Sequence, residues 1–144
     1  MKITTAYLKQ LRACKSGIDE FNDLFPDGEA ELNSENLSKA RCGGLDIIWL
    51  IERIADQATL AKLSNDESVW VREAVARHPN TPPIALVTLS NDKSESVRRR
   101  VARHPSTPPI ALAKLSSDED YSVRCRVADN PNTPQGTTNE AETR

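Results

Sequence analysis

The chain repeats one block of its own sequence without a gap. Residues 64–89 read SNDESVWVREAVARHPNTPPIALVTL, residues 90–115 read SNDKSESVRRRVARHPSTPPIALAKL, and residues 116–134 read SSDEDYSVRCRVADNPNTP. Ala76, Ala102 and Ala128 occupy equivalent places in the three copies, so the step between them is the period. A repeat of this length is typical of solenoids, in which each copy buries its apolar face only by stacking on its neighbours.

The first half of each copy predicts a short helix. Val71, Ala74 and Val75 have the i, i+3, i+4 spacing of a helical apolar stripe. The preceding Ser-Asn-Asp segment offers side chains suited to an N-cap, and the helix is expected to end at His78, because the residue before a proline disfavours the α region.

The second half of each copy predicts another short helix. Thr81 is expected to cap it and Pro82 to occupy its first position, where a missing N–H costs nothing. Its expected buried face is Ile84, Ala85, Leu86 and Leu89. Because this helix has little more than two turns, we expect it to be 3₁₀ in part. Leu60 and Leu63 lie one period before Leu86 and Leu89, so a degenerate copy is expected to begin near Asp56.

Residues 1–55 have a different pattern. Helices are predicted after Thr4 or Thr5, over 18–25, from Ser34, and over 45–54, the last of which is apolar enough to be buried nearly all round. The sequence therefore predicts an all-α fold: a helical cap over 1–55 that covers the open end of the first repeat, a short α-solenoid over 56–134, and a disordered tail over 135–144.

Composition excludes several classes of protein. A net charge of −2 argues against binding nucleic acid or membranes over the whole surface. No apolar run approaches the roughly 18–20 residues that span a bilayer, and no secretory signal is visible. Cys14, Cys42 and Cys125 lie far apart, so neither a disulfide framework nor a zinc site is indicated. We expect a cytoplasmic protein with no metal and no cofactor.

Three regularly spaced groups of polar residues have competing interpretations. The arginines at 72, 98 and 124 each follow an aspartate at the same spacing, which favours a structural Asp–Arg ladder over a row of phosphate ligands. His78, His104 and Asn130 are equivalent positions; a stacking step separates them, which excludes a shared metal and favours capping by a partly protonated imidazole. With both histidines assigned, no general base is left and the chain is not expected to be an enzyme.

A second set of arginines has no regular acidic partner. Residues 72–103 contain seven lysines and arginines against three acidic residues. This stripe is interpreted equally well as an anion-binding face for nucleic acid or an acidic protein, and as a solvated helix face. Trp70 replaces a serine of the other copies and either packs on the cap or anchors an interface. The candidate partner-binding residues are Trp70, Glu73, Arg77, Arg99, Arg100, Arg103 and Arg126.

The cysteines are interpreted as structural residues. Cys14 and Cys42 are expected to be small buried hydrophobes. Cys125 is expected to be half exposed on its helix, without an accompanying base.

The repeat resembles a known family. The pattern Asp-x-x-x-x-Val-Arg-x-x-Val-Ala-x-(His/Asn)-Pro-x-Thr-Pro, followed by Ile-Ala-Leu-x-x-Leu, resembles the leucine-rich repeat variant, a HEAT-like α-solenoid unit, over residues 56–134. The resemblance implies a right-handed superhelix of alternating α and 3₁₀ helices. One described member carries an iron–sulfur cluster on cysteines ahead of its repeats. Here Cys14 and Cys42 lack partners at short spacing, so no cluster is expected.

The resemblance also bears on function. HEAT-like solenoids mostly bind proteins, and a minority bind nucleic-acid backbones. Residues 11–14, 21–28 and 44–49 look like a module found at the start of bacterial and phage-associated proteins of unassigned role. We therefore expect a non-catalytic protein-binding module, related to phage or mobile elements, with nucleic-acid backbone binding as the alternative. The sequence does not specify the partner or the oligomeric state.

Overall fold

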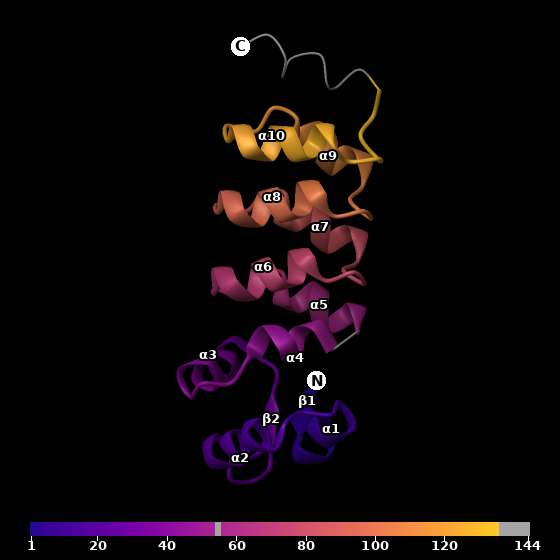
Figure 1. Ribbon diagram of the computed structural model, residues 1–144. Helices are drawn as coiled ribbons and strands as arrows, with labels where there is room; N and C mark the ends of the chain where they lie inside the picture. Colours follow the sequence, from indigo (N-terminus) through magenta and orange to yellow (C-terminus); the bar gives the residue numbers. More distant parts are fainter. Residues whose placement is uncertain (54–55, 136–144) are drawn as a thin grey trace. The chain divides into compact units, whose positions relative to one another are not determined.

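The computed structural model describes residues 1–53 and 56–135 (Figure 1). Contacts along the chain divide it into two compact units, Met1–Ala55 and Asp56–Arg144. Apart from Gln135, the tail predicted to be disordered lies outside the described residues, as does Ile54 at the end of the fourth predicted helix.

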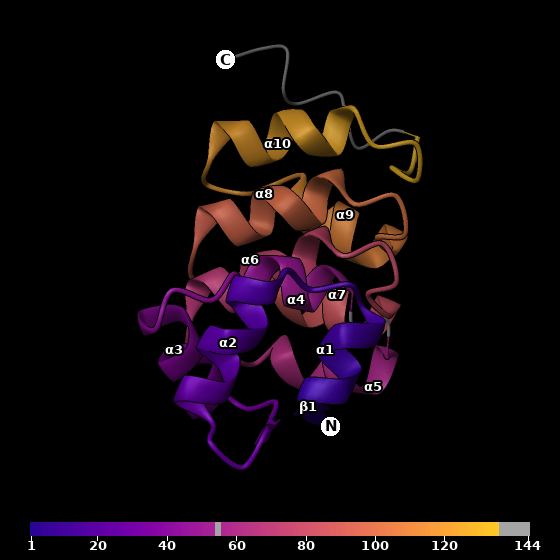
Figure 2. The same cartoon turned by 60° about the horizontal axis from the view of Figure 1, so that its bottom comes forward.

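The second unit is a stack of paired helices, as predicted. In chain order its helices are α5 (Gln57–Leu63), α6 (Val69–Arg77), α7 (Pro83–Leu89), α8 (Glu95–Arg103), α9 (Pro109–Leu115) and α10 (Tyr121–Ala128). Figure 2 shows α6, α8 and α10 lying side by side, and contacts join α5 to α7 and α7 to α9 in a second row. The first helix of each copy therefore forms one row and the second helix forms the other. Helix α5 lies one period before α7, which confirms the degenerate copy.

The core of this unit lies between the two rows. Val75 and Leu86 are fully buried, and so are their equivalents Val101 and Leu112. Each such side chain contributes roughly 1.5–3 kcal/mol when it is buried. The prediction that Ile84 is buried was wrong, because it is 69% exposed on the outer side of α7.

The ends of the second helices differ from the prediction. Pro82 is the N-cap of α7 and Pro83 is its first residue, and α7 and α9 are α-helical over their whole length. Thr81 does not cap α7, because its hydroxyl donates to the Val75 carbonyl at the end of α6. The threonine thus closes the first helix of the copy and fixes the turn that follows it.

The first helices also begin later than expected. The Ser-Asn-Asp segment ends the preceding helix, with Ser64 as the C-cap of α5, and α6 starts only after Ser68. Asp66 still orders this turn, because its Oδ1 accepts from the Ser68 N–H at 2.9 Å.

The first unit contains a feature that the sequence analysis did not predict. Strands β1 (Lys2–Thr4) and β2 (Glu29–Glu31) form an antiparallel pair, in which Ile3 lies opposite Ala30. Over residues 1–53 and 56–135 the fold is therefore all-α apart from this small strand pair. The turn before β2 uses Gly28 at φ +70°, where an L side chain is rarely found.

Within residues 1–53 the first unit also contains the helices α1 (Thr5–Gln10), α2 (Lys15–Leu24), α3 (Ser34–Cys42) and α4 (Ile47–Arg53). Thr4 caps α1, as predicted, by accepting the Tyr7 N–H at 3.1 Å. Asn33, not Ser34, caps α3. The role of these helices as a cap on the first repeat stays a prediction.

Burial in the first unit corrects two expectations. Helix α4 is not buried all round, because Ile48 is 37% exposed while Ile47 and Ile51 are buried. Cys14 and Cys42 are both exposed, so neither is a core hydrophobe, whereas Cys125 is partly exposed as predicted.

Candidate interaction surface

The arginines at 72 and 98 are structural. Arg72 Nε donates to Asp92 Oδ2 at 2.6 Å and its Nη2 donates to Oδ1 at 3.1 Å, a bidentate pair between neighbouring copies. Its Nη1 also donates to the Asp66 carbonyl at 2.7 Å. The hydrogen bond to Asp92 raises the pKa of the Arg72 guanidinium, although burial opposes this. These contacts confirm the Asp–Arg ladder and leave this arginine no role as a phosphate ligand.

The same contacts recur one copy later. Arg98 donates to Asp118 Oδ2 at 2.7 Å and to its Oδ1 at 3.0 Å, and to the Asp92 carbonyl at 2.8 Å. Each of these distances is nearly the same as its counterpart at Arg72. The step from α6 to α8 therefore has the same local geometry as the step from α8 to α10.

A second ladder runs through the equivalent positions His104 and Asn130. His104 Nε2 lies 2.9 Å from the His78 carbonyl, and its Nδ1 accepts the Ser106 N–H at 3.1 Å. This arrangement requires a neutral imidazole protonated at Nε2. The expected position at the helix C-terminus is confirmed, since His104 is the C-cap of α8, but the partly protonated imidazole is not what these contacts select.

Asn130 performs the same task as the histidine. Its Nδ2 donates to the Ala102 and His104 carbonyls at 2.7 and 3.0 Å, and its Oδ1 accepts the Asn132 N–H at 2.9 Å. An amide and a neutral imidazole are interchangeable here because each offers a donor to the preceding copy and an acceptor to its own turn.

The candidate partner-binding residues lie on a different face of the first helices. Positions 70, 73, 74 and 77 of α6 have the i, i+3, i+4, i+7 spacing of one helical face, and positions 96, 99, 100 and 103 repeat it on α8. Because α6, α8 and α10 lie side by side, these faces form one surface, which we call the first-helix face (Figure 2). It carries Trp70, Glu73, Arg77, Arg99, Arg100, Arg103 and Arg126.

Exposure on the first-helix face varies. Trp70 is 48% exposed. Arg77, Arg99, Arg103 and Arg126 are exposed, whereas Glu73 and Arg100 are partly buried. All seven candidates are therefore accessible to some degree from one side of the stack.

Two arginines of this face have acidic partners that the sequence analysis missed. Arg100 Nε lies 3.0 Å from Glu73 Oε1 on the neighbouring helix, and Arg126 Nη1 lies 3.4 Å from Asp129 Oδ2 on its own copy. Glu73 and Arg100 are not equivalent positions of the repeat, so a search for equivalent positions does not find their contact. Among the described residues, no carboxylate lies within ion-pair distance of Arg99 or Arg103.

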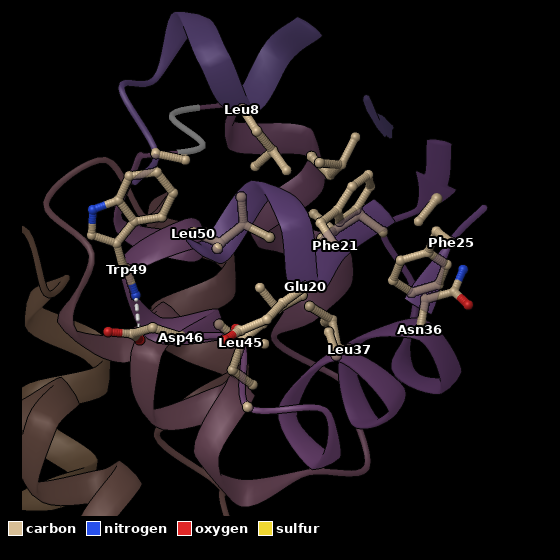
Figure 3. A pocket seen from close by; sticks show the side chains of 18 of the residues that line it. Leu8, Glu20, Phe21, Phe25, Asn36, Leu37, Leu45, Asp46, Trp49 and Leu50 are labelled. Carbon is tan, nitrogen blue, oxygen red and sulfur yellow. Dashed lines mark hydrogen bonds between the residues drawn. The ribbon is translucent and has the colours of Figure 1, made fainter. Parts of the chain in front are cut away.

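The first unit contains an apolar cavity of about 480 Å³ that the sequence did not predict (Figure 3). Leu8, Phe21, Leu37 and Leu50 line it, so α1, α2, α3 and α4 all contribute to its walls. Of its polar lining residues, Asp46 is engaged with its own helix, since its Oδ1 accepts the Trp49 N–H at 2.9 Å. Helical spacing predicts which residues point inward but not how completely they fill the space between helices.

Cys14 lies at the edge of this cavity, at the N-cap of α2. Its Sγ is 3.3 Å from the Ser16 hydroxyl, and this hydrogen bond, with a further one from the Gly17 N–H, lowers the pKa of the thiol. The described residues that line the cavity include no histidine. In the part of the chain that the structure describes, no group of three His, Cys, Asp or Glu side chains could hold a metal ion.

Comparison with known families identifies one segment. Residues 69–94 match the family model described as leucine rich repeat variant, a HEAT-like helical repeat. The match covers α6, α7 and the turn before α8, which together are one period of the repeat, and it confirms the predicted resemblance. Neither the comparison with curated proteins nor the comparison with solved structures found a match. No helix among the described residues is long and apolar enough to cross a membrane.

Proposed function

We propose that this chain is a non-catalytic module that binds another protein through the first-helix face. The observation that carries the proposal is the difference between two sets of arginines. Arg72 and Arg98 are buried in the Asp–Arg ladder, whereas Arg99 and Arg103 are exposed without an ionic partner in the described residues. The guanidinium groups of Arg99 and Arg103 are therefore available to a partner on this face.

Trp70 supports a protein partner. Tryptophan and arginine are among the residues most enriched where binding energy concentrates in protein interfaces. An indole that is 48% exposed, on the same face as exposed guanidinium groups, combines both types. Repeats of this family are typically non-catalytic, which agrees with the structural contacts of both imidazoles: His104 bonds the His78 carbonyl, and His78 Nδ1 accepts the Asn80 N–H at 3.1 Å.

Nucleic-acid backbone binding is the alternative, carried by Arg77, Arg99, Arg100, Arg103 and Arg126. The ion pairs of Arg100 with Glu73 and of Arg126 with Asp129 weaken it, because they place carboxylates within the stripe. A phosphate backbone laid along the face would meet these carboxylates, whereas a protein surface can match a face of mixed charge. We also propose a cytoplasmic location, on the wide spacing of the three cysteines, and a relation to phage proteins, on the sequence resemblance of residues 11–14, 21–28 and 44–49.

Affinity capture from the host lysate tests the proposal. The wild-type protein should retain a partner that the triple variant Arg99→Ala, Arg100→Ala, Arg103→Ala does not retain, with both proteins equally folded by circular dichroism. Retention of the same proteins by both would contradict the assigned face.

Binding to duplex DNA at several salt concentrations tests the alternative. Phosphate contacts predict that log K falls with log salt by about 0.9 for each contact. No DNA binding at low salt would exclude the nucleic-acid function.

A further inference from the structure

The two steps between first helices share their buried contacts and differ in their exposed ones. In both steps an arginine of one copy forms a bidentate pair with an aspartate of the next, at nearly equal distances. On the exposed side, the first step pairs Glu73 of α6 with Arg100 of α8. One period later, the residues at these two positions are Arg99 and Arg126.

The second step therefore places two guanidinium groups where the first step places a carboxylate and a guanidinium. Since the two steps have the same geometry, Arg99 and Arg126 extend from backbone positions that allow contact in the first step. Arg103 lies one helical turn after Arg99 on the same face and adds a third positive charge.

The chain itself compensates this arrangement only weakly. Arg126 turns to Asp129 at 3.4 Å, with side chains that are 48% and 71% exposed, and an exposed pair of this kind contributes little. Arg99 and Arg103 have no acidic partner among the described residues. The first step thus has the Glu73 carboxylate opposite Arg100, and the second step has Arg99 at the position of Glu73. The additional carboxylate of the second step, Glu119, contacts Arg98 of the Asp–Arg ladder.

We propose that the space between Arg99 and Arg126, with Arg103 beside it, is a binding site for an aspartate or glutamate side chain of the partner protein. The inference rests on the proposed function, because it requires the partner to lie on the first-helix face. A carboxylate is the occupant that the molecule itself uses at this place, in the form of Glu73. A carboxylate also accepts hydrogen bonds from two guanidinium groups at once.

The site favours an isolated carboxylate over a run of phosphates. Glu73 precedes it on the neighbouring helix and Asp129 follows Arg126 at the end of α10, so negative charge bounds the site on the same face. A single acidic side chain needs only the space between the two arginines, whereas the adjacent phosphates of a nucleic acid would extend towards these carboxylates.

Charge-reversal variants test the site, with poly-L-glutamate as the probe at low salt. Arg99→Glu gives the second step the carboxylate that Glu73 provides in the first, so the new side chain should pair with Arg126. The melting temperature should stay the same or rise, and the affinity for poly-L-glutamate should fall by about tenfold or more. Glu73→Arg places an arginine opposite Arg100, as Arg99 lies opposite Arg126 in the second step, and should raise the affinity for poly-L-glutamate. Lys114→Glu reverses a charge in the same way on α9, in the other row of helices, and serves as the matched control.

Three results would overturn the inference. Arg99→Glu could reduce binding no more than Lys114→Glu does, which would show a general charge effect. It could lower the melting temperature, which would show that Arg99 and Arg126 are not placed like Glu73 and Arg100. Duplex DNA could bind more tightly than poly-L-glutamate and lose binding with the same variant, which would make the site a phosphate site.

These experiments distinguish a failure of the carboxylate site from a failure of the proposed protein-binding face. If the triple alanine variant loses the captured partner while Arg99→Glu still binds poly-L-glutamate as wild type does, the first-helix face stands and the carboxylate site fails. If Arg99→Glu loses poly-L-glutamate while the triple variant still retains the captured proteins, the site stands as an anion site and the proposed partner face fails.

Discussion

In the repeat unit, equivalent hydrogen bonds join one copy to the next at both interfaces between first helices. In residues 1–53 the helices and strands are all different, so their contacts do not recur. Arg98 repeats the contacts of Arg72, and Asn130 repeats those of His104. In residues 1–53 the strand pair and the unlike helices α1 to α4 pack around a cavity of about 480 Å³. Side chains that pack well at one interface between copies also pack well at each equivalent interface. In an irregular unit every interface is different, and gaps remain where the side chains do not fit together.

The comparison predicts that a core leucine of the repeat unit contributes more to the free energy of unfolding than a core leucine of the first unit does. Leu86 is completely buried between the two rows, so Leu86→Ala should cost roughly 2–5 kcal/mol. Leu37 is also buried but lines the cavity, so its side chain already lacks some contacts, and Leu37→Ala should cost less. Urea unfolding followed by circular dichroism measures both.

Arg99→Ala is the control for this experiment, because an exposed side chain without partners should change stability by less than about 0.5 kcal/mol. An equal or larger cost for Leu37→Ala would remove the distinction between the two cores. Unfolding by Arg99→Ala would make that arginine structural and the assigned face wrong.

The copied ion pairs should be the next most sensitive contacts of the repeat unit. Asp118→Ala leaves the Arg98 guanidinium, whose side chain is only 10% exposed, without its bidentate partner. Removal of one member of a buried pair lowers the free energy of unfolding by about 3–5 kcal/mol. Because the Arg98 side chain keeps some exposure to solvent, we expect a loss at the lower end of this range. In the first unit, removal of Glu29 from its exposed pair with Lys2 should have almost no effect, which is the matched comparison. Similar losses at the two sites would contradict the assignment.

Acid should weaken the same ladder. Burial disfavours the charged form of Asp118, but the hydrogen bonds from Arg98 and the Asp120 N–H outweigh it and hold the pKa of Asp118 below its usual value. The resulting stability is therefore complete above the unfolded-state pKa of about 3.9 and is lost as the pH falls through that value towards the folded-state pKa.

Urea midpoints measured between pH 6 and about pH 3 test this pH dependence. The midpoint should fall more steeply in the wild type than in Asp118→Asn, which cannot titrate. Parallel curves would mean that Asp118 does not contribute. Other low-pKa groups such as Asp56 are common to both proteins and cancel in the difference.

The second ladder permits a smaller and more selective test. His104→Ala removes one of the two hydrogen bonds to the His78 carbonyl, which keeps the Thr81 N–H, and leaves the Ser106 N–H without its partner, at a cost of roughly 1–3 kcal/mol. His104→Asn should recover most of this loss, because Asn130 satisfies the equivalent groups, the His104 carbonyl and the Asn132 N–H, one copy later. If asparagine were as damaging as alanine, the two positions would not be equivalent in the way their contacts indicate.

The smallest expected effect is in the first unit and concerns reactivity. Because hydrogen bonds from Ser16 and Gly17 lower the pKa of Cys14, its thiol should react with iodoacetamide at neutral pH faster than Cys42, which is also exposed. Peptide mapping by mass spectrometry measures both rates in one sample. Ser16→Ala should slow Cys14 alone, and an unchanged rate would show that the hydroxyl has no such effect.

The repeat unit was more predictable from sequence for the same reason that its contacts recur. The spacing of Val71 and Val75 predicted the first helices, and the regular aspartates predicted the ladder of Arg72 and Arg98. The burial of Ile84 was predicted wrongly, because a helix of two turns has too few residues for spacing to define its inner face. The short strands β1 and β2 likewise have too few residues to show an alternating pattern.

The sequence predicted which helices carry the residues of the first-helix face, but it did not predict which of these residues form ion pairs with one another. The repeat placed all seven residues on the first helices. It could not reveal that Glu73 meets Arg100, since that contact joins positions that are not equivalent in the two copies. The electrostatic character of the face depends on such contacts, so it required coordinates.

The reach of Arg72 across to Asp92 of the next copy has an evolutionary consequence. Excision of residues 90–115 would bring Asp118 to the place that Asp92 now holds, and Asn130 to that of His104. Each lost hydrogen bond or ion pair of Arg72 and His78 would then be replaced by an equivalent one, whereas loss of a number of residues that is not a multiple of the period would leave these groups mismatched. Such a gene can be shortened or extended only in whole units, and each one moves the outermost helix by about 8–10 Å.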